Sequence, residues 1–466
     1  MAGIGFELRR ALDERASLWV RMRAWVSAGL VASGPWMVTV VILTWLHVVS
    51  RGRFEGEDYA LFRGIVTYSA AFSLMFVGAL QIPLIRRIAD WLWARQHDRA
   101  LPGFSAALAV TGAVQVPIGG LFAWHLGLAP IDGLLAVTLY LVCTWSWLAL
   151  NWLGVIRDYG QILRAYAIGG ALSIAATAVP ALRSSLTGLL LLFTAGQAIT
   201  LMLLCGAILR GIETSDRRSL DVFGAVRTMP VLLTIGVLYN VGIWLDKLIF
   251  WAVDGIAIRG LLRQHPLYDT CSFLAYATVV PALAIHLVRT ETLFYEHYRG
   301  YFESMEQGRP LQFIRAARER MVSTLRTNVL RIMRLQAWVT GTVLLLAPEI
   351  LEGLGMSPGA APTFRMLCIG SYFHVLFLLT LLILLYFDSR VAAAKSAGVF
   401  FALNLTLPWL AAQGTPVFYG AGYSLAALGS LLVGFGYLQR DLGRLEYLTF
   451  TRQLRQYKAR PATGPR

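Results

Sequence analysis

The sequence predicts an all-α polytopic membrane protein with about twelve transmembrane helices in two six-helix lobes. Three observations support this prediction: 57% of the 466 residues are hydrophobic, only 14% are charged, and the apolar residues fall into twelve long runs. A soluble domain carries roughly 25% charged residues. Each run is long enough to cross a hydrocarbon core of about 30 Å. Because lipid offers no hydrogen-bond partners to the backbone, runs of this kind form helices.

The apolar runs divide the chain into a cytoplasmic amphipathic N-terminal helix, an N-lobe of six spans, a cytoplasmic linker, a C-lobe of six spans and a basic cytoplasmic tail. In that order, the predicted boundaries are 1–23, 24–210, 211–227, 228–438 and 439–466. The polar, arginine-rich start is too long for the n-region of a secretory signal, so we interpret the first run as a retained span. The predicted spans are 24–49, 60–85, 101–126, 130–156, 161–181, 186–209, 228–253, 267–288, 335–352, 362–387, 391–412 and 416–438.

The basic residues predict how these spans are oriented. Of 41 Lys and Arg residues, 33 fall in the predicted inner segments, seven fall in the outer segments, and Lys247 lies within a span. Loops rich in Lys and Arg stay in the cytoplasm. We therefore expect both termini to be cytoplasmic. In a membrane protein the location of the basic residues matters more than the net charge of +15, so we expect no nucleic-acid partner.

The sequence lacks the residue patterns that ATP hydrolysis and metal or disulfide sites need. None of the three lysines follows a glycine, so the sequence has no Gly-Lys phosphate-binding loop for ATP hydrolysis. Each of the four cysteines stands alone in an apolar run, without the spacing of a metal site or a disulfide framework. We expect no catalytic residues, no metal site and no cofactor.

The seventh run contains the most informative stretch, Tyr239–Trp251, because it holds an acid and a base side by side. A charge in hydrocarbon costs several kcal/mol or more, so charged residues there usually face a pathway. Adjacent helix positions differ by about 100°, which predicts that Asp246 and Lys247 point in different directions. We expect Asn240 and Asp246 to face a path between the lobes, while Lys247 either joins them or extends outward to the interface.

Four other polar residues in the runs are weaker candidates for the transport path. Each has a competing interpretation as a partner in an interhelical hydrogen bond. A histidine can also carry a proton in a transport cycle, and an arginine at the outer start of the second span could extend to the membrane surface. These candidates are His374, Asn404, Gln81 and Arg63. Tryptophans crowd the fourth run, where we expect an interfacial aromatic belt; they are Trp145, Trp147 and Trp152.

The largest predicted cytoplasmic excursion, at about 289–334, has a helical pattern of apolar and basic residues. Two interpretations remain open: a docking surface for a partner or for anionic lipid, and a solvated extension of the ninth span. The docking candidates are Arg315, Arg318, Arg320 and Arg326.

Three stretches resemble the PelG family of inner-membrane transporters of the Pel exopolysaccharide system. They are Met-Ala-Gly-Ile-Gly-Phe-Glu-Leu-Arg-Arg at the N-terminus, Tyr239–Trp251, and Glu291–Phe302. The resemblance covers the whole chain. One departure is Arg87, in Arg86–Asp90, where the family has tyrosine.

The resemblance implies a multidrug-antiporter (MATE)-like or flippase-like fold of the multidrug/oligosaccharidyl-lipid/polysaccharide superfamily, in the bacterial inner membrane. It implies export of an amino-sugar exopolysaccharide from cytoplasm to periplasm, contributing to a biofilm matrix. It also implies a cytosolic glycosyltransferase and membrane scaffold and regulatory subunits as partners. Because such proteins are transporters, no catalytic role carries over to any residue.

Other functions remain as alternatives. The same fold would suit an ion-coupled antiporter of organic cations, with Asp246 holding a proton or Na⁺, or a flippase of lipid-linked oligosaccharides. A membrane glycosyltransferase is disfavoured because the outer loops are small and the inner excursion is mainly basic and aromatic. A major-facilitator carrier is disfavoured because residues 94–101 lack that class's Gly-x-x-x-Asp-Arg loop.

Overall fold

The computed structural model describes residues 57–156, 159–183, 185–211, 220–289 and 293–451, together with isolated positions between 17 and 46. Most of the predicted N-terminal helix and most of the predicted first span lie outside these residues. So do residues 212–219 of the linker and residues 452–466 of the tail.

The N-lobe consists of helices that correspond to predicted spans two to six. They are α4 (Glu57–Trp93), α5 (Ala100–His125), α6 (Pro130–Ile156), α7 (Tyr159–Ala176), α8 (Pro180–Arg183) and α9 (Leu186–Gly211). Helix α4 passes through Pro83 and continues beyond the predicted end of its span. Its 37 residues extend about 55 Å at 1.5 Å per residue, which exceeds a hydrocarbon core of about 30 Å. One end of α4 therefore projects beyond the apolar layer.

A short linker helix, α10 (Gly224–Thr228), leads into the C-lobe. Predicted span eight is divided between α12 and α13, and the helix of span nine bends by 66° where α15 meets α16. The C-lobe helices are α11 (Pro230–Val253), α12 (Pro266–Ala277), α13 (Val280–Arg289), α14 (Tyr295–Glu306), α15 (Leu311–Leu345), α16 (Ala347–Gly353), α17 (Ala361–Tyr386), α18 (Arg390–Ala412) and α19 (Ala421–Gly443).

Within the described residues, nine helices are long and apolar enough to cross a membrane, or ten if α15 and α16 form one bent span. Helix α7, on the predicted fifth span, is not among them. The multi-span, almost entirely helical architecture is confirmed. The total of twelve spans and the cytoplasmic location of the termini remain predictions.

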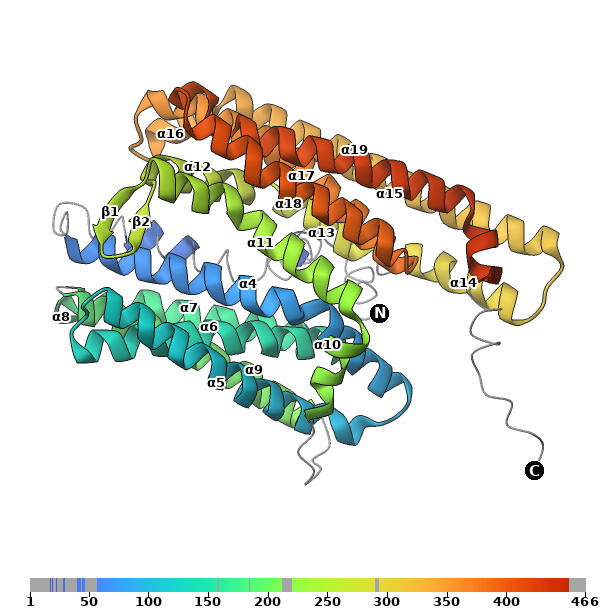
Figure 1. Ribbon diagram of the computed structural model, residues 1–466, viewed down its shortest axis with the longest axis horizontal. Helices are drawn as coiled ribbons and strands as arrows, with labels where there is room; N and C mark the ends of the chain where they lie inside the picture. Colours follow the sequence, from blue (N-terminus) through green and yellow to red (C-terminus); the bar gives the residue numbers. More distant parts are fainter. Residues whose placement is uncertain are drawn as a thin grey trace.

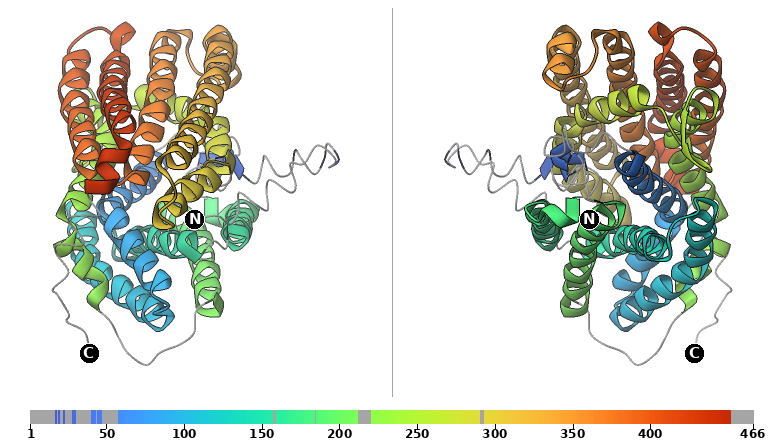
Figure 2. Two further views of the ribbon diagram at one scale, coloured as in Figure 1. Left: turned by 90° about the vertical axis from the view of Figure 1, so that its right-hand side faces the viewer. Right: turned by 90° about the vertical axis from the view of Figure 1, so that its left-hand side faces the viewer.

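The helices form two groups, and α4 and α11 lie side by side where the groups meet (Figures 1 and 2). The approach is close: a Cβ atom on Gly236 of α11 would lie 2.5 Å from the Ala79 carbonyl oxygen of α4. Each lobe has its own apolar core. The N-lobe core includes Leu84, Phe104, Trp152 and Ile208, and the C-lobe core includes Phe250, Phe364, Phe377 and Phe400.

A small antiparallel hairpin interrupts the helical architecture between α11 and α12. Its strands are β1 (Ile256–Arg259) and β2 (Leu262–Gln264), and Gly260 has a φ of +54° in the turn between them. The sequence predicts only a short outer loop between the seventh and eighth spans, because strands of three or four residues produce no clear alternation of apolar and polar residues.

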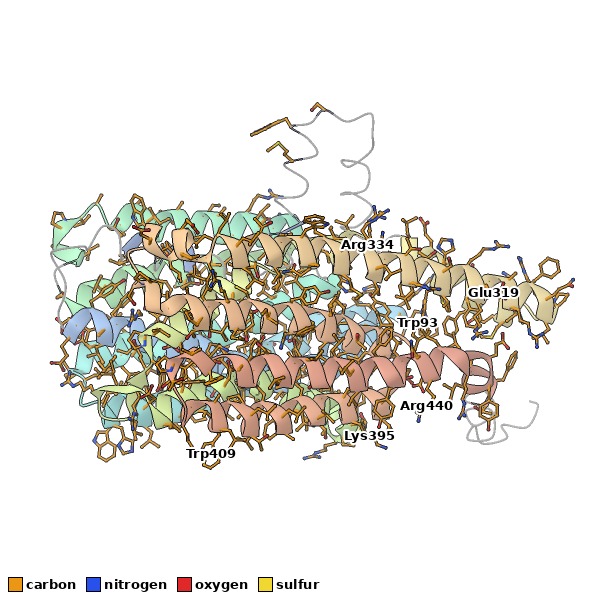
Figure 3. All side chains as sticks on the ribbon, turned by 90° about the horizontal axis from the view of Figure 1, so that it is seen from above. Trp93, Glu319, Arg334, Lys395, Trp409 and Arg440 are labelled. Atoms are coloured by element: carbon orange, nitrogen blue, oxygen red, sulfur yellow. The ribbon has the colours of Figure 1, made fainter. Side chains whose placement is uncertain are left out.

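The excursion before the ninth span is helical, as the pattern predicts. Helix α15 is continuous over 35 residues, about 52 Å, so the excursion extends directly from the helix of the ninth span. Figure 3 shows α15 projecting past the neighbouring helices on the side of Glu319. The preceding α14 packs its aromatic side chains on the end of α17, where the Tyr298 hydroxyl donates to the Tyr386 carbonyl oxygen at 3.1 Å.

Candidate functional site

The side chains of Asp246 and Lys247 form a buried ion pair on α11. Lys247 Nζ lies 2.9 Å from Asp246 Oδ2 and 3.0 Å from Oδ1. The two residues are 0% and 4% exposed. The prediction that these neighbours point in different directions is therefore wrong. The long, flexible lysine stem brings the ammonium group back to the adjacent carboxylate instead of extending to the membrane surface.

Tyrosines from neighbouring helices complete the surroundings of this pair. The Tyr268 hydroxyl of α12 donates to Asp246 Oδ2 at 2.8 Å. Lys247 Nζ donates to the Tyr276 hydroxyl at 3.2 Å and to the Ile243 carbonyl oxygen of its own helix at 3.3 Å. Each charge thus has several polar partners, as a buried charge requires. We call Asp246, Lys247, Tyr268, Tyr276, Tyr423 and His374 the C-lobe cluster; all are buried except Tyr276, which is half-buried.

His374 joins this cluster from α17. Its Nε2 lies 3.1 Å from the Tyr239 hydroxyl, and its ring stacks on Tyr423 of α19 with centroids 5.8 Å apart. The structure therefore brings together three sequence candidates: Asp246, Lys247 and His374. Sequence reasoning missed the tyrosines, because single tyrosines in separate apolar runs carry no spacing that would place them around one point.

The two asparagine candidates lie elsewhere around α11. Asn240 Nδ2 donates to the Gly236 carbonyl oxygen of its own helix at 2.9 Å, and its side chain lies against Gly78 of α4, at the boundary between the lobes. Asn404 Nδ2 of α18 donates to the Gly242 carbonyl oxygen at 2.8 Å, inside the C-lobe. Asn240 therefore lies at the boundary between the lobes, whereas Asp246 contacts Tyr268 of α12 within the C-lobe. The role of either residue in a transport path remains a prediction.

Arg63 of α4 binds the hairpin. Its Nη2 and Nε donate to Gln264 Oε1 at 2.9 and 3.1 Å, and Gln264 Nε2 donates to the Ala60 carbonyl oxygen at 3.1 Å. The Tyr68 hydroxyl donates to the Arg263 carbonyl oxygen at 2.9 Å. Because α4 belongs to the N-lobe and the hairpin to the C-lobe, these bonds connect the lobes at one end. We call them the hairpin latch.

Aromatic stacking continues this connection between the lobes. The Tyr68 ring of α4 stacks on Trp251 of α11, with centroids 4.7 Å apart and an interplanar angle of 11°. At the far side of the hairpin, Arg259 Nη2 donates to the Gly127 carbonyl oxygen at the α5–α6 turn at 3.1 Å. The hairpin therefore contacts two separate parts of the N-lobe.

A second polar group fixes the same end of the C-lobe. Asp254 follows α11, and its Oδ2 accepts a hydrogen bond from the Tyr419 hydroxyl at 2.6 Å and lies 3.0 Å from His265 Nε2. The hydrogen bond from Tyr419, with a further contribution from His265, lowers the pKa of Asp254. His265 Nδ1 also accepts from the Tyr268 backbone N–H at the start of α12. The end of α11, the start of α12 and the loop before α19 are thus held together.

The remaining path and docking candidates have varied surroundings. Gln81 is half-buried on α4. Arg318 Nη2 donates to the Leu442 carbonyl oxygen at 2.7 Å, so this arginine fixes α15 to the end of α19. Arg315 is exposed and lies 3.9 Å from Glu446, and Arg320 and Arg326 are exposed. Arg315, Arg320 and Arg326, but not Arg318, therefore leave most of their guanidinium surface open to a partner.

The tryptophans of α6, expected to form an interfacial belt, bond to neighbouring helices. Trp152 is fully buried and its Nε1 donates to the Ala100 carbonyl oxygen at 3.0 Å. Trp145 Nε1 donates to the Leu108 carbonyl oxygen at 3.1 Å, and Trp147 lies 3.3 Å from the Ser73 hydroxyl. These rings pack against neighbouring helices of the N-lobe. A tryptophan-rich run is compatible with a membrane interface and with the interior of a helix bundle. The sequence therefore does not distinguish these two locations, and the packing does.

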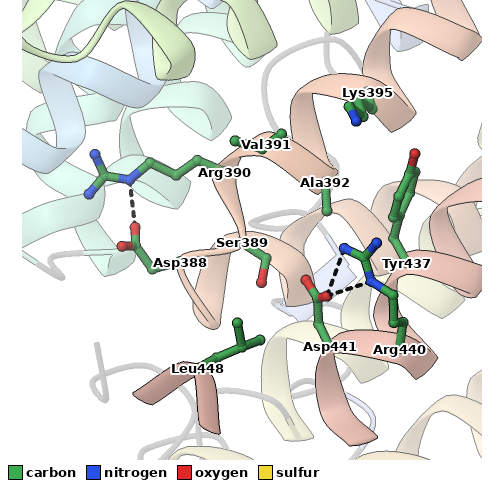
Figure 4. Close-up of a pocket in the computed structure, with 10 residues that line it drawn as sticks. All are labelled: Asp388, Ser389, Arg390, Val391, Ala392, Lys395, Tyr437, Arg440, Asp441 and Leu448. Carbon is green, nitrogen blue, oxygen red and sulfur yellow. Dashed lines mark hydrogen bonds and ion pairs between the residues drawn. The ribbon is translucent and has the colours of Figure 1, made fainter. Parts of the chain in front are cut away.

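A cavity of about 530 Å³ lies where α18 begins and α19 ends (Figure 4). Both arginines that line it are paired with neighbouring carboxylates, Arg390 with Asp388 at 2.6 Å and Arg440 with Asp441 at 3.2 Å. No predicted path residue lines it. The lining residues are Asp388, Ser389, Arg390, Val391, Ala392, Lys395, Tyr437, Arg440, Asp441 and Leu448. In the part of the chain that the structure describes, no group of three His, Cys, Asp or Glu side chains could hold a metal ion.

Solved structures of transporters share this fold. An outward-facing MATE-family multidrug resistance transporter of the MOP superfamily aligns with a TM-score of 0.65 and 11% identity, covering 91% of this chain and 96% of that one. An inward-facing conformation of such a transporter gives 0.55 and 12%, covering 87% and 94%. A MOP-superfamily transporter from Pyrococcus furiosus, with a binding pocket of reversed polarity, gives 0.61 and 11%, covering 91% and 96%.

At these identities the likeness shows the fold alone. No curated protein matches the sequence. The family comparison is more specific: the model of PelG, described as "Putative exopolysaccharide Exporter (EPS-E)", matches residues 1–450, nearly the whole chain. With its two-lobed MATE-like transporter fold, this multi-pass membrane protein belongs to the PelG family of exopolysaccharide exporters.

Proposed function

We propose that the protein exports an amino-sugar exopolysaccharide of the Pel type across the bacterial inner membrane, from cytoplasm to periplasm, and so contributes to a biofilm matrix. It has no catalytic activity of its own in this proposal. The observation that carries the proposal is the family match over residues 1–450, on a chain whose fold is that of a transporter.

The contact between the lobes supports a transport path along α4 and α11. Asn240 lies in this contact, and the hairpin latch joins the lobes at the predicted outer end. Release of the latch would let the lobes separate there, while the close approach of Gly236 to the Gly78 and Ala79 carbonyl oxygens acts as a pivot. A threaded polymer prevents full closure, so either stepwise movement through loose gates or a continuous conduit is compatible with this path.

The projecting part of α15 suits a cytosolic partner. Arg315, Arg320 and Arg326 are exposed, and the helix extends past its neighbours. We propose that this surface binds the cytosolic glycosyltransferase or the membrane scaffold and regulatory subunits of the Pel system. A basic helical surface of this kind attracts an acidic protein surface or anionic lipid.

The alternatives are an ion-coupled antiporter of organic cations and a flippase of lipid-linked oligosaccharides. The solved structures described as multidrug transporters favour the antiporter, but only because they share the fold. One observation weighs against it: the Asp246 carboxylate, the natural ion-binding group, is already held by Lys247 and Tyr268.

Deletion of the gene tests the proposal. We expect secreted amino-sugar polymer to disappear while the cytosolic synthase remains at its normal level and retains activity in lysates. Expression of the wild-type chain from a plasmid should restore secretion. Unchanged secretion in the deletion strain would refute the proposed function. If that strain secretes polymer normally but differs from the wild type in drug sensitivity, the antiporter would be favoured.

A further inference from the structure

The surroundings of Lys247 Nζ have the chemistry of a binding site for a small organic ammonium ion. The ammonium group lies 2.9 Å from a carboxylate oxygen whose side chain is 1% exposed. It also faces three aromatic rings, with Nζ 4.8 Å from the Tyr276 centroid, 5.7 Å from Tyr423 and 5.8 Å from Trp244. Carboxylate and aromatic faces together are the usual means of recognising an alkylammonium group.

We propose that Asp246, Tyr276, Tyr423 and Trp244 form a cation site inside the C-lobe, and that Lys247 fills it permanently as a covalently attached ligand. The partners come from three helices, α11, α12 and α19, so the site is built by the tertiary fold and not by α11 alone. The Tyr268 hydroxyl, 2.8 Å from Asp246 Oδ2, keeps the carboxylate oriented toward the ammonium group.

This assignment explains why a carboxylate can remain in an apolar lobe without an ion from solution. A buried unpaired carboxylate would be strongly unfavourable, and the adjacent lysine supplies the opposite charge within the same helix turn. A consequence, which rests on the proposed transport function, is that no external cation is exchanged at Asp246 during export. The binding site itself does not depend on that function.

Removing the lysine side chain tests the proposal on the purified full-length protein. Lys247→Ala should lower the midpoint of thermal unfolding by about 5 °C, because the carboxylate loses its partner. Methylammonium, ethylammonium or propylammonium chloride should then raise the midpoint again, saturably, by at least half of the loss. Tetraethylammonium is too bulky for the space that one lysine stem vacates, and should have no such effect.

Matched controls separate binding from general salt effects. The wild-type protein should not respond to alkylammonium, because its site is filled. The double variant Asp246→Asn/Lys247→Ala should not respond either, because the carboxylate is gone. Equal responses in all three proteins, or none in Lys247→Ala, would overturn the proposal. A sodium effect in Lys247→Ala that exceeds the alkylammonium effect would also overturn it, because aromatic recognition would then contribute nothing.

If Lys247→Ala does not accumulate, growth of the expressing cells with ethylammonium provides a second measurement. The proposal predicts more membrane-inserted Lys247→Ala protein with ethylammonium than without, and no change for the double variant. Equal amounts of both variants under both conditions would contradict it.

Discussion

At the scale of single residues, the main finding is that the charges of α11 neutralise each other. A buried ion pair contributes little net stability, because the cost of desolvation offsets most of the attraction. Loss of one partner is nevertheless strongly destabilising, because it leaves the other charge buried and unpaired. Asp246 and Lys247 are both buried, so each depends on the other more than on the lipid or on water. Substitutions here must therefore be compared in pairs before a transport role is assigned.

Asp246→Asn should destabilise the protein by about 3–5 kcal/mol, because it leaves the Lys247 ammonium buried without a carboxylate. Asp246→Asn/Lys247→Met removes both charges and should recover most of that loss. Thermal unfolding in detergent measures both, and export assays on protein that remains folded separate stability from transport. Equal destabilisation of the single and double variants would contradict the pairing.

At the scale of elements, α4 and α11 are held together by small residues and by the hairpin. Glycines allow the two backbones to approach, as small residues do in membrane helix packing. The hairpin adds side-chain hydrogen bonds from Arg63 and Tyr68 at one end. The contact therefore has a tight middle and a polar end, and the two parts are separately testable.

Gly236→Ala should lower the thermal midpoint and reduce export, because its Cβ would lie 2.5 Å from the Ala79 carbonyl oxygen. Gly341→Ala on α15 is the matched control, since a Cβ there meets nothing within 4 Å. Alanine is a better helix former than glycine by about 1 kcal/mol, so the control should be neutral or stabilising. Similar losses for both variants would argue against a close α4–α11 contact.

Cysteine labelling can follow the hairpin latch. In a background without native cysteines, Leu262→Cys should be protected from a maleimide, since Leu262 is 0% exposed, while Leu261→Cys, at a residue that is 64% exposed, should react fully. Adding Arg63→Ala removes the bonds to Gln264 and should increase labelling at position 262 several-fold without affecting position 261. Unchanged protection at 262 would mean that the latch bonds do not hold the lobes together.

At the scale of the whole molecule, the separation of basic residues predicts that the hairpin is periplasmic and the projecting end of α15 cytoplasmic. These two features lie at opposite ends of the long axis (Figure 1). The long α15 and α4 extend beyond a hydrocarbon layer of about 30 Å toward the basic end. This orientation places the exposed arginines where a cytosolic synthase could reach them.

An impermeant maleimide applied to intact spheroplasts should label Leu261→Cys, and should label Glu319→Cys only after the membrane is permeabilised. Both side chains are exposed, so access to the compartment is the difference being measured. The opposite result would invert the topology and the direction proposed for export.

The sequence by itself determined the membrane class, most helix positions and the family, because these depend on composition, run length and extended stretches of residues. It also singled out Asp246, Lys247 and His374, since polar groups in apolar runs are rare. Only the tertiary structure decided what these groups contact. The tyrosines of α12 and α19, the hairpin bond to Arg63 and the burial of Trp152 all depend on which helices pack together. Contacts between residues distant in the chain leave no local pattern, so no reading of single runs could have found them.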